Sequence, residues 1–348
     1  MEQAKIDRIN AYARRVKAGE ALTPAEEADR AALRAEYVAA VRKSLEQQLD
    51  HTLIQEPDGT RHRLPKRRSE LMRVTVLIEN TAPAGLACEH GLSLHIEHGG
   101  RRWLLDAGAS PRLVENAAAL EVDLGAVDAA VLSHGHFDHA GGFSAFFARN
   151  AAAPLYLRPQ ALEPGYVRTR SEPRYIGVPG ELAGYAQRLR FVDGPLEAAP
   201  GVWLLPHDTP GLARRGRAVS MYRETAAGAV DDDFSHEQSL IFVTDDGLVL
   251  FSSCSHAGAD TVVEEARRFF PGRPVRAFLG GFHLMGHGGV TTLGAPPAAV
   301  EALGRRLLEL GVEEVWTGHC TGAPGLALLE EAAPGKVRAI HAGDILEF

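Results

Sequence analysis

The 348-residue sequence has few cysteines and no long apolar run. Its three cysteines, Cys88, Cys254 and Cys320, are too few and too scattered for a disulfide framework, and their odd number is typical of a reducing compartment. No window approaches the roughly 18 apolar residues that a membrane-spanning helix needs, and the first residues carry no apolar segment after their charges. We therefore expect a cytoplasmic protein with no membrane segment.

Positive charge is scarce over most of the chain. Residues 1–73 carry 15 Lys and Arg against 12 Asp and Glu, and the remainder carries 22 against 33, which gives a net charge of −8 overall. Nucleic-acid binding needs clustered Lys and Arg, so we expect no nucleic-acid partner. The length and the 45% hydrophobic content favour one large domain and one small one.

The first 65 residues predict a small helical domain. Apolar residues recur at helical spacing over residues 3–17, and a second helix begins at the capping box Thr23-Pro24-Ala25-Glu26 and extends to about Leu49. Two such helices form an antiparallel hairpin that is too small to bury much surface alone. The hairpin is expected to dock on the main domain or on a second copy of the chain, as a homo-oligomer.

Three short stretches of this segment carry a resemblance to a known family. K-I-D-R-I-N from Lys5, L-T-P-A-E from Leu22 and L-R-A-E-Y from Leu33 resemble the YnzC-like family of small bacterial two-helix proteins, over residues 3–65. That family is functionally obscure, so the resemblance names the segment without explaining its role.

From Arg73 onward the pattern changes to alternating strands and helices, which predicts a second domain over residues 73–348. Strands are expected at 74–78, 92–97, 103–105, 129–132, 155–157, 202–205, 240–243, 248–252, 277–279, 314–317 and 336–340, and helices at 111–120, from 143, at 259–270 and at 296–310. No glycine-rich phosphate loop follows the first strand, which favours a layered α/β domain that does not bind nucleotides. The Pro-, Gly- and Arg-rich stretch from Gln160 to His236 is expected to be irregular, as lids and substrate loops often are.

The run His134-Gly135-His136-Phe137-Asp138-His139 carries the chemistry. It follows a predicted buried strand and precedes Gly141-Gly142, so four potential ligands leave the sheet on one tight turn. Neutral imidazole and carboxylate are preferred ligands of Zn(II), and also of Fe(II) and Mn(II). We expect His134 and His136 to bind one cation and Asp138 and His139 to bind a second, so the cofactor is one or two zinc ions, with manganese or iron as the other choices.

These residues reproduce in full the His-x-His-x-Asp-His signature of the metallo-β-lactamase fold superfamily, which the chain resembles over residues 73–348. The resemblance implies an α/β architecture, an αββα sandwich with the cations at one sheet edge, here joined to an N-terminal helical hairpin. Asp106, in L-L-D-A-G, matches the earlier acidic position of the superfamily, which implies that it orients a ligand imidazole.

Two distant histidines are expected to complete the coordination. His256 and His319 each follow a predicted strand and have glycine nearby, and by position His256 joins the first cation and His319 the second. His236 or Cys254 stands as an alternative to His256, because other branches of the superfamily take the third histidine from an earlier loop. No aspartate stands at the usual bridging position.

Four further motifs resemble the branch of the superfamily named for 7,8-dihydropterin synthases. They are E-H-G-L-S from Glu89, C-S-H-A-G from Cys254, G-G-F-H-L from Gly280 and G-H-C-T-G from Gly318. That branch is linked to a ribofuranosylaminobenzene 5′-phosphate substrate. His283 is a candidate for proton transfer or for holding an anionic group. His90 carries a weaker signal, and His207, His287 and His341 carry none above background.

Hydrolysis is the expected chemistry, because a bound cation ionises water at neutral pH. Asp138 is expected both to bind metal and to orient that water, and His283 to protonate a leaving group. We expect an anionic small molecule, a phosphoester above all, as substrate, with Arg168, Arg170 and Arg174 as candidates to hold its phosphate.

Two alternatives remain. One is a dihydropterin synthase-like transferase that joins a pterin to an aminobenzene ribofuranosyl phosphate, and the other is a metal-containing small-molecule sensor that acts through the N-terminal hairpin. The sequence leaves open the natural substrate, the identity and number of the metal ions, the role of the hairpin and the oligomeric state.

Overall fold

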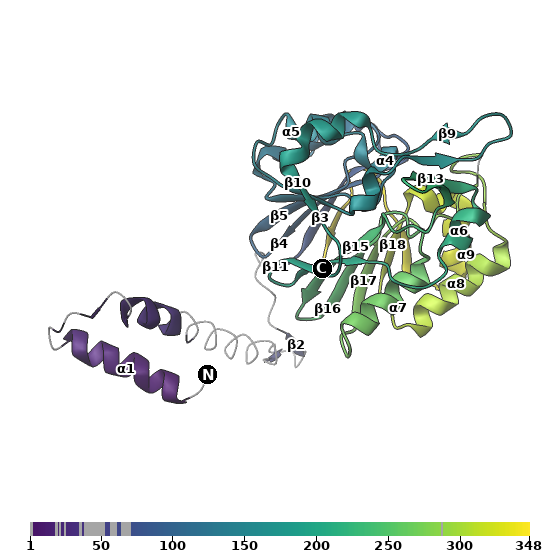
Figure 1. Cartoon of the computed structure of the whole chain (residues 1–348). Helices are drawn as coiled ribbons and strands as arrows, with labels where there is room; N and C mark the ends of the chain where they lie inside the picture. Colours follow the sequence, from purple (N-terminus) through teal and green to yellow (C-terminus); the bar gives the residue numbers. More distant parts are fainter. Residues whose placement is uncertain are drawn as a thin grey trace. The chain divides into compact units, whose positions relative to one another are not determined.

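A computed structural model of the chain describes residues 3–17, 20, 22–23, 26–34, 37, 53–55, 61–63, 71–286 and 288–348 (Figure 1). The chain divides into two compact units, Met1–Arg68 and Ser69–Phe348. Over the described residues, no helix is long and apolar enough to cross a membrane.

The N-terminal unit begins with helix α1, Gln3–Lys17, and residues 26–34 form a second helix. The predicted capping box is confirmed: the amide of Thr23 donates to Glu26 Oε2 at 2.9 Å, and the amide of Glu26 donates to Thr23 Oγ1 at 3.3 Å. Ion pairs Arg15–Glu26 and Arg8–Asp29 join the two helices in antiparallel order. The expected extension of the second helix to Leu49 lies largely outside the described residues.

Two short strands follow in this unit. They are β1 (Leu53–Gln55) and β2 (Arg61–Arg63), and they pair antiparallel.

Two seven-stranded sheets form the centre of the main unit. The first has the order β10-β7-β6-β5-β4-β3-β20 and consists of β3 (Arg73–Ile78), β4 (Ser93–His98), β5 (Arg101–Leu105), β6 (Ala129–Val131), β7 (Leu155–Leu157), β10 (Leu189–Phe191) and β20 (Ile345–Glu347). The second has the order β11-β12-β15-β16-β17-β18-β19 and consists of β11 (Leu196–Ala199), β12 (Val202–Pro206), β15 (Gln238–Thr244), β16 (Gly247–Phe251), β17 (Val275–Gly280), β18 (Val315–Thr317) and β19 (Val337–Ala339).

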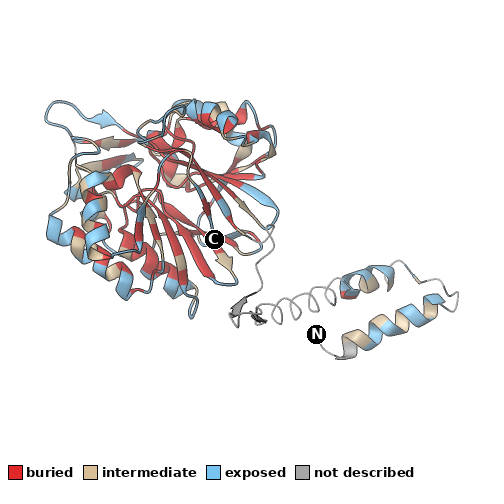
Figure 2. Ribbon diagram, turned by 180° about the vertical axis from the view of Figure 1, so that it is seen from behind, coloured by how far each residue is buried: buried red, intermediate tan, exposed pale blue. Residues whose placement is uncertain are grey.

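The two sheets enclose one apolar core, and helices cover their outer faces. Trp103 of the first sheet meets Phe242 of the second edge to face, with ring centroids 6.2 Å apart, and both are buried. The outer face of the first sheet packs on α3 (Arg112–Ala119) and α5 (Phe143–Phe147), and that of the second packs on α7 (Ala259–Phe269), α8 (Pro297–Glu309) and α9 (Gly322–Ala332). Buried residues concentrate in the paired sheets (Figure 2). The predicted αββα sandwich is therefore confirmed.

The stretch from Gln160 to His236 is not irregular, so that expectation is wrong. It holds a four-stranded sheet of order β14-β13-β8-β9, made of β8 (Gly165–Val167), β9 (Arg174–Tyr175), β13 (Met221–Thr225) and β14 (Gly228–Asp231), and the helix α6 (Ala213–Ala218). Strands of two to five residues are too short to show a period. Their pairing depends on cross-strand contacts such as Tyr166 stacked on Tyr222 at 5.3 Å.

Helix α9 and strand β20 were also not predicted. Strand β20 pairs antiparallel with β3 and so completes the edge of the first sheet with the last residues of the chain. A three-residue strand gains its stability from this pairing and carries little signal of its own.

The topology determines where the site forms. Strands β5, β6 and β7 run parallel in the first sheet, and β16, β17, β18 and β19 run parallel in the second. The carboxyl ends of parallel strands lie at one sheet edge, where α/β proteins bind ligands. The His-rich run follows β6, and His256, His283 and His319 follow β16, β17 and β18.

Candidate metal centre

The His-rich run leaves β6 and enters the one-turn helix α4 (Phe137–Ala140). Two glycines after it allow the chain to pass against the loop that follows β5. A Cβ at Gly141 would lie 2.0 Å from the carbonyl oxygen of Ala109, and one at Gly142 would lie 2.1 Å from that of Ala107. Only glycine fits this close backbone approach.

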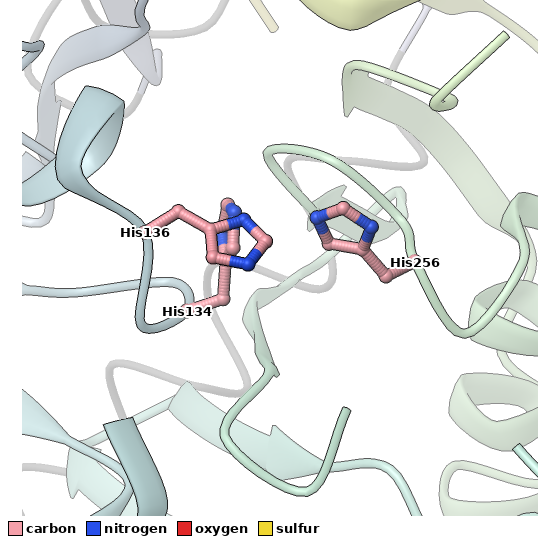
Figure 3. Close-up of side chains that lie close together, drawn as sticks. All are labelled: His134, His136 and His256. Carbon is pink, nitrogen blue, oxygen red and sulfur yellow. The ribbon is translucent and has the colours of Figure 1, made fainter. Parts of the chain in front are cut away.

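His134, His136 and His256 form a first cluster of ligands (Figure 3). The ring centroids are 4.6 Å apart for His134 and His136, 5.0 Å for His134 and His256, and 4.9 Å for His136 and His256. Nε2 of His134, Nε2 of His136 and both ring nitrogens of His256 are buried without a hydrogen-bond partner among the described residues. Buried nitrogens are rarely left unpaired. One unpaired nitrogen from each of the three imidazoles, all close together, therefore fits a bound cation.

A hydrogen-bond chain sets the orientation of His134. Ser133 Oγ donates to Asp106 Oδ2 at 2.7 Å and therefore accepts from Nδ1 of His134 at 2.8 Å. The proton of this imidazole is thus on Nδ1, and the lone pair of Nε2 faces the cluster.

A second cluster lies beside the first and centres on Asp138. Its carboxylate Oδ2 lies 3.4 Å from Nε2 of His319, 3.6 Å from Nε2 of His139 and 3.2 Å from Nε2 of His90. Cys254 Sγ lies 3.3 Å from Nε2 of His139. Carboxylate, imidazole and thiol together form a donor set that suits Zn(II).

Partners on the far side of each ring direct the lone pairs of this cluster as well. The carboxylate of Asp106 can only accept, so Nδ1 of His139 donates to it at 2.7 Å. Nδ1 of His319 lies 2.9 Å from Oδ1 of Asn80, whose amide group in turn donates to the carbonyl of His319. The two Nε2 lone pairs then face each other at 3.2 Å, an arrangement that needs a cation or a proton between them.

The imidazoles of the two clusters differ in the direction in which their pKa values are shifted. Burial lowers the pKa of His136 to about 3, and burial with neighbouring imidazoles lowers the pKa values of His134 and His256 well below the ordinary range. For His139 burial acts in the same direction, but the carboxylates of Asp138 and Asp106 outweigh it and raise its pKa to about 9. The first cluster therefore consists of neutral imidazoles, the form that binds metal, and the second attracts positive charge.

Strained backbone is found at the same sheet edge. Asp106, Ser255, His283 and His319 have φ between +48° and +58°, the left-handed region that costs non-glycine residues free energy. All four stand in loops that leave parallel strands at the site. Such strain persists only where surrounding contacts impose it.

Two buried glutamates supply such contacts. Glu79 accepts from the amide of His319 at 2.6 Å, and Glu237 accepts from the amides of His256 and Ala257 at 2.9 Å each. His207 supports this arrangement, because its Nε2 lies 3.4 Å from Glu237. Sequence reasoning missed these residues, since a lone glutamate beside a strand carries no local signal.

Of the alternatives to His256, His236 lies behind the His-rich loop. Its Nδ1 accepts from the amide of Gly135 at 3.1 Å and its Nε2 lies 3.0 Å from Asp232, so both ring nitrogens are engaged. It shares a potential cluster with His136 and Asp232, but the hydrogen bonds make it the weaker candidate. Cys254 faces the second cluster and also lies 3.3 Å from Cys320 Sγ.

A cavity of ≈ 380 Å³, here called the metal-site cavity, opens over both clusters. His90 and His283 line it, and the ring of His283 lies 4.3 Å from that of His256. Of the three arginines predicted to hold phosphate, Arg174 also lines this cavity, whereas Arg168 pairs with Asp231. His287 lies outside the described residues.

Comparison with known proteins agrees with this geometry. Residues 87–221 match the family described as the metallo-beta-lactamase superfamily. The matched residues lie in the main unit and include the His-rich run. The chain is 29% identical to Tm1679, described as a metal-dependent hydrolase of the beta-lactamase superfamily, with a TM-score of 0.67 over 80% of this chain and 99% of that one. The superfamily resemblance stated from the sequence is confirmed.

One curated relative of the chain is a synthase. The chain is 28% identical to the 7,8-dihydropterin-6-methyl-4-(beta-D-ribofuranosyl)-aminobenzene-5'-phosphate synthase of Methanocaldococcus jannaschii, over 75% of this chain and 90% of that protein. The resemblance to the dihydropterin synthase branch is thus confirmed, and the reaction of this chain is a separate question.

The N-terminal unit has relatives of its own. Residues 4–61 match the family described as "Bacterial protein of unknown function (DUF896)". The segment is 40% identical to UPF0291 protein LMOf2365_1322 of Listeria monocytogenes over 17% of this chain and 79% of that protein. The YnzC-like resemblance is confirmed, and none of these descriptions assigns the segment a function.

Proposed function

We propose that this chain is a metal-dependent hydrolase that acts on a phosphoester or a related anionic small molecule. The observation that carries the proposal is the pair of ligand clusters in one cavity, with unpaired buried nitrogens in the first and opposed imidazole lone pairs in the second. His134, His136 and His256 would hold one cation. Asp138, His139 and His319 would hold the other, with Cys254 in reach.

A divalent cation at these ligands supplies a Lewis acid and ionises water at neutral pH. The protein supplies orientation and proton transfer. Besides His139 and His319, Asp138 has a further partner in His90, which is half exposed and holds the carboxylate on the cavity side. His283 presents its imidazole to the cavity from a left-handed turn, where it can donate a proton to a leaving group.

The rest of the cavity wall favours an organic anion. Apolar side chains line it beside the clusters, namely Val167, Ile176, Val219, Met221 and Met285, and they limit the access of bulk water. Arg174 adds positive charge at the same wall. A low-dielectric wall strengthens the attraction between the site and a phosphoryl group.

A second candidate is a dihydropterin synthase-like transferase. The identity of 28% over 90% of the Methanocaldococcus jannaschii synthase favours it. This reaction needs two substrates at once, a pterin diphosphate and an aminobenzene ribofuranosyl phosphate, whereas hydrolysis needs one substrate and water.

The test begins with elemental analysis of protein purified without added metal. The metal-loaded chain is then assayed on a panel of phosphomonoesters and phosphodiesters and, separately, on the two synthase substrates together. Hydrolysis that is lost in Asp138→Asn and retained in Asp128→Asn, an exposed aspartate outside the site, supports the hydrolase. Conjugate formation without hydrolysis selects the transferase, and bound metal with neither activity favours a sensor.

A further inference from the structure

A second and larger cavity, ≈ 700 Å³, adjoins the metal-site cavity and is here called the side cavity. Four residues line both, namely Ala218, Val219, His256 and His283. A molecule whose reacting group lies at the ligand clusters can therefore extend past His256 and His283 into the side cavity.

The wall nearest the shared histidines is apolar and partly aromatic. Phe234 lies parallel to the ring of His256, with centroids 4.7 Å apart and planes 10° apart, and Phe282, Leu284 and Leu303 continue the lining. Phe234, Phe282 and Leu284 are buried. Such a wall matches a flat aromatic or other apolar group.

Positive charge is found elsewhere on the lining. Arg306 is held by Glu264 at 2.8 Å and Glu309 at 3.0 Å, so its charge is already neutralised. Arg215 and Arg305 differ from it. Both are half exposed, and their acidic contacts are long, 3.8 Å from Arg215 to Asp260 and 3.5 Å from Arg305 to Glu301. Two guanidinium groups with weak partners line this cavity.

The first turn of α7 lies next to Arg215. A Cβ placed on Gly258, the residue before the helix, would lie 2.5 Å from Nη2 of Arg215. The guanidinium group therefore lies beside the N-terminus of an 11-residue helix, next to Asp260, whose Oδ1 accepts from the amide of Thr261 at 3.0 Å.

We propose that the side cavity is a recognition subsite for the part of an elongated substrate that does not react. Its occupant is a flat aromatic or apolar body that ends in an anionic group, a phosphate or a carboxylate. The body packs on Phe234 and Leu303, and the anion lies between Arg215 and Arg305. This inference rests on the proposed function, since it assigns the reacting end of the same molecule to the metal-site cavity.

The test uses the full metal-loaded chain and two phosphodiesters with the same nitrophenolate leaving group. One carries a phenyl arm and the other a phenyl arm with a para carboxylate. We expect the charged arm to raise kcat/KM about tenfold in the unsubstituted protein, and Arg215→Ala and Arg305→Ala each to reduce that preference about threefold or more. Turnover of the diester with the uncharged phenyl arm should fall less in both variants than turnover of the diester with the carboxylate arm. Arg338→Ala is the matched control. Arg338, on β19, lies over the ring of Trp316 on β18 and lines neither cavity.

A binding experiment separates this inference from the hydrolase proposal. The two corresponding phosphonates, in which a CH2 group replaces the scissile ester oxygen, are titrated calorimetrically. Tighter binding of the charged phosphonate that depends on Arg215 and Arg305 supports the subsite even if no ester is cleaved, in which case only the hydrolase proposal fails. Equal binding of both phosphonates, or a preference that survives both substitutions, overturns the subsite even if both esters are hydrolysed.

Discussion

Asp106→Asn is the sharpest test of how the second ligand cluster is oriented. Asp106 is fully buried, accepts from the amide of Ser133 at 2.7 Å through Oδ1, and accepts from Nδ1 of His139 at 2.7 Å through Oδ2. Asparagine keeps the shape but replaces one acceptor by a donor. If its amide group faces His139, the proton of that imidazole must move to Nε2, which then no longer binds metal; if it faces Ser133, two buried donors oppose each other.

The expected losses of metal affinity and of folding stability follow from either outcome. Loss of an outer partner of a ligand imidazole weakens metal binding by roughly 10- to 100-fold, or about 1.4 to 2.8 kcal/mol. A buried polar group left unpaired destabilises the fold by about 1 to 3 kcal/mol. We therefore expect Asp106→Asn to bind the second cation at least tenfold more weakly, with a lower Tm.

The assay is a competition titration of each variant against a chromophoric chelator, together with metal content by mass spectrometry. Asp245→Asn, in an exposed turn between β15 and β16, is the control and should match the unsubstituted protein. If Asp106→Asn keeps both cations at unchanged affinity, the orienting role of Asp106 is wrong.

Three further predictions concern residues outside the two ligand clusters. Burial lowers the pKa of His207, but the hydrogen bond to Glu265 and the charges of Glu237 and Glu265 together outweigh burial and raise the pKa. The contribution of His207 to stability is therefore full below pH 6.5 and is lost as pH rises through the raised pKa. In denaturant unfolding, His207→Gln should lose about 1 to 3 kcal/mol at pH 6 and less at pH 10; an equal loss at both would contradict this. Gly141→Ala should lower both Tm and metal content, because its Cβ would meet backbone at 2.0 Å, whereas Gly184→Ala, with nothing within 4 Å, should change neither. Phe242→Ala, between the sheets, should cost about 3 to 5 kcal/mol of unfolding free energy, and a loss below 1 kcal/mol would show that the core is not close-packed there.

The sequence could predict the parts of the site whose signal is local. The His-rich run is contiguous, and His256 and His319 each follow a strand that is apolar enough to recognise. Parallel strands place their carboxyl ends together, so the convergence of these loops could be inferred before the structure.

The contacts that hold the site in place were not predictable in this way. Glu79 and His319 are 240 residues apart, and Cys254 and Cys320 are 66 apart. Their proximity depends on strand order, which a single sequence does not reveal. The prediction missed the four-stranded sheet between Gln160 and His236 for another reason. Its strands are too short to show a period and depend on tertiary pairing.

The distance along the chain between the two imidazoles of the second cluster has a consequence for biosynthesis. His139 and His319 are 180 residues apart, so a ribosome has already extruded the His-rich loop long before it translates the partner. A nascent chain can offer an ion only a partial ligand set. Full affinity for the ion appears once the second seven-stranded sheet, whose strands precede His256 and His319, has formed. Contacts of such long range also slow folding. We expect metal capture to be a late, post-translational event, and a cell starved of the bound metal to accumulate a fully translated chain whose ligand clusters have not yet formed.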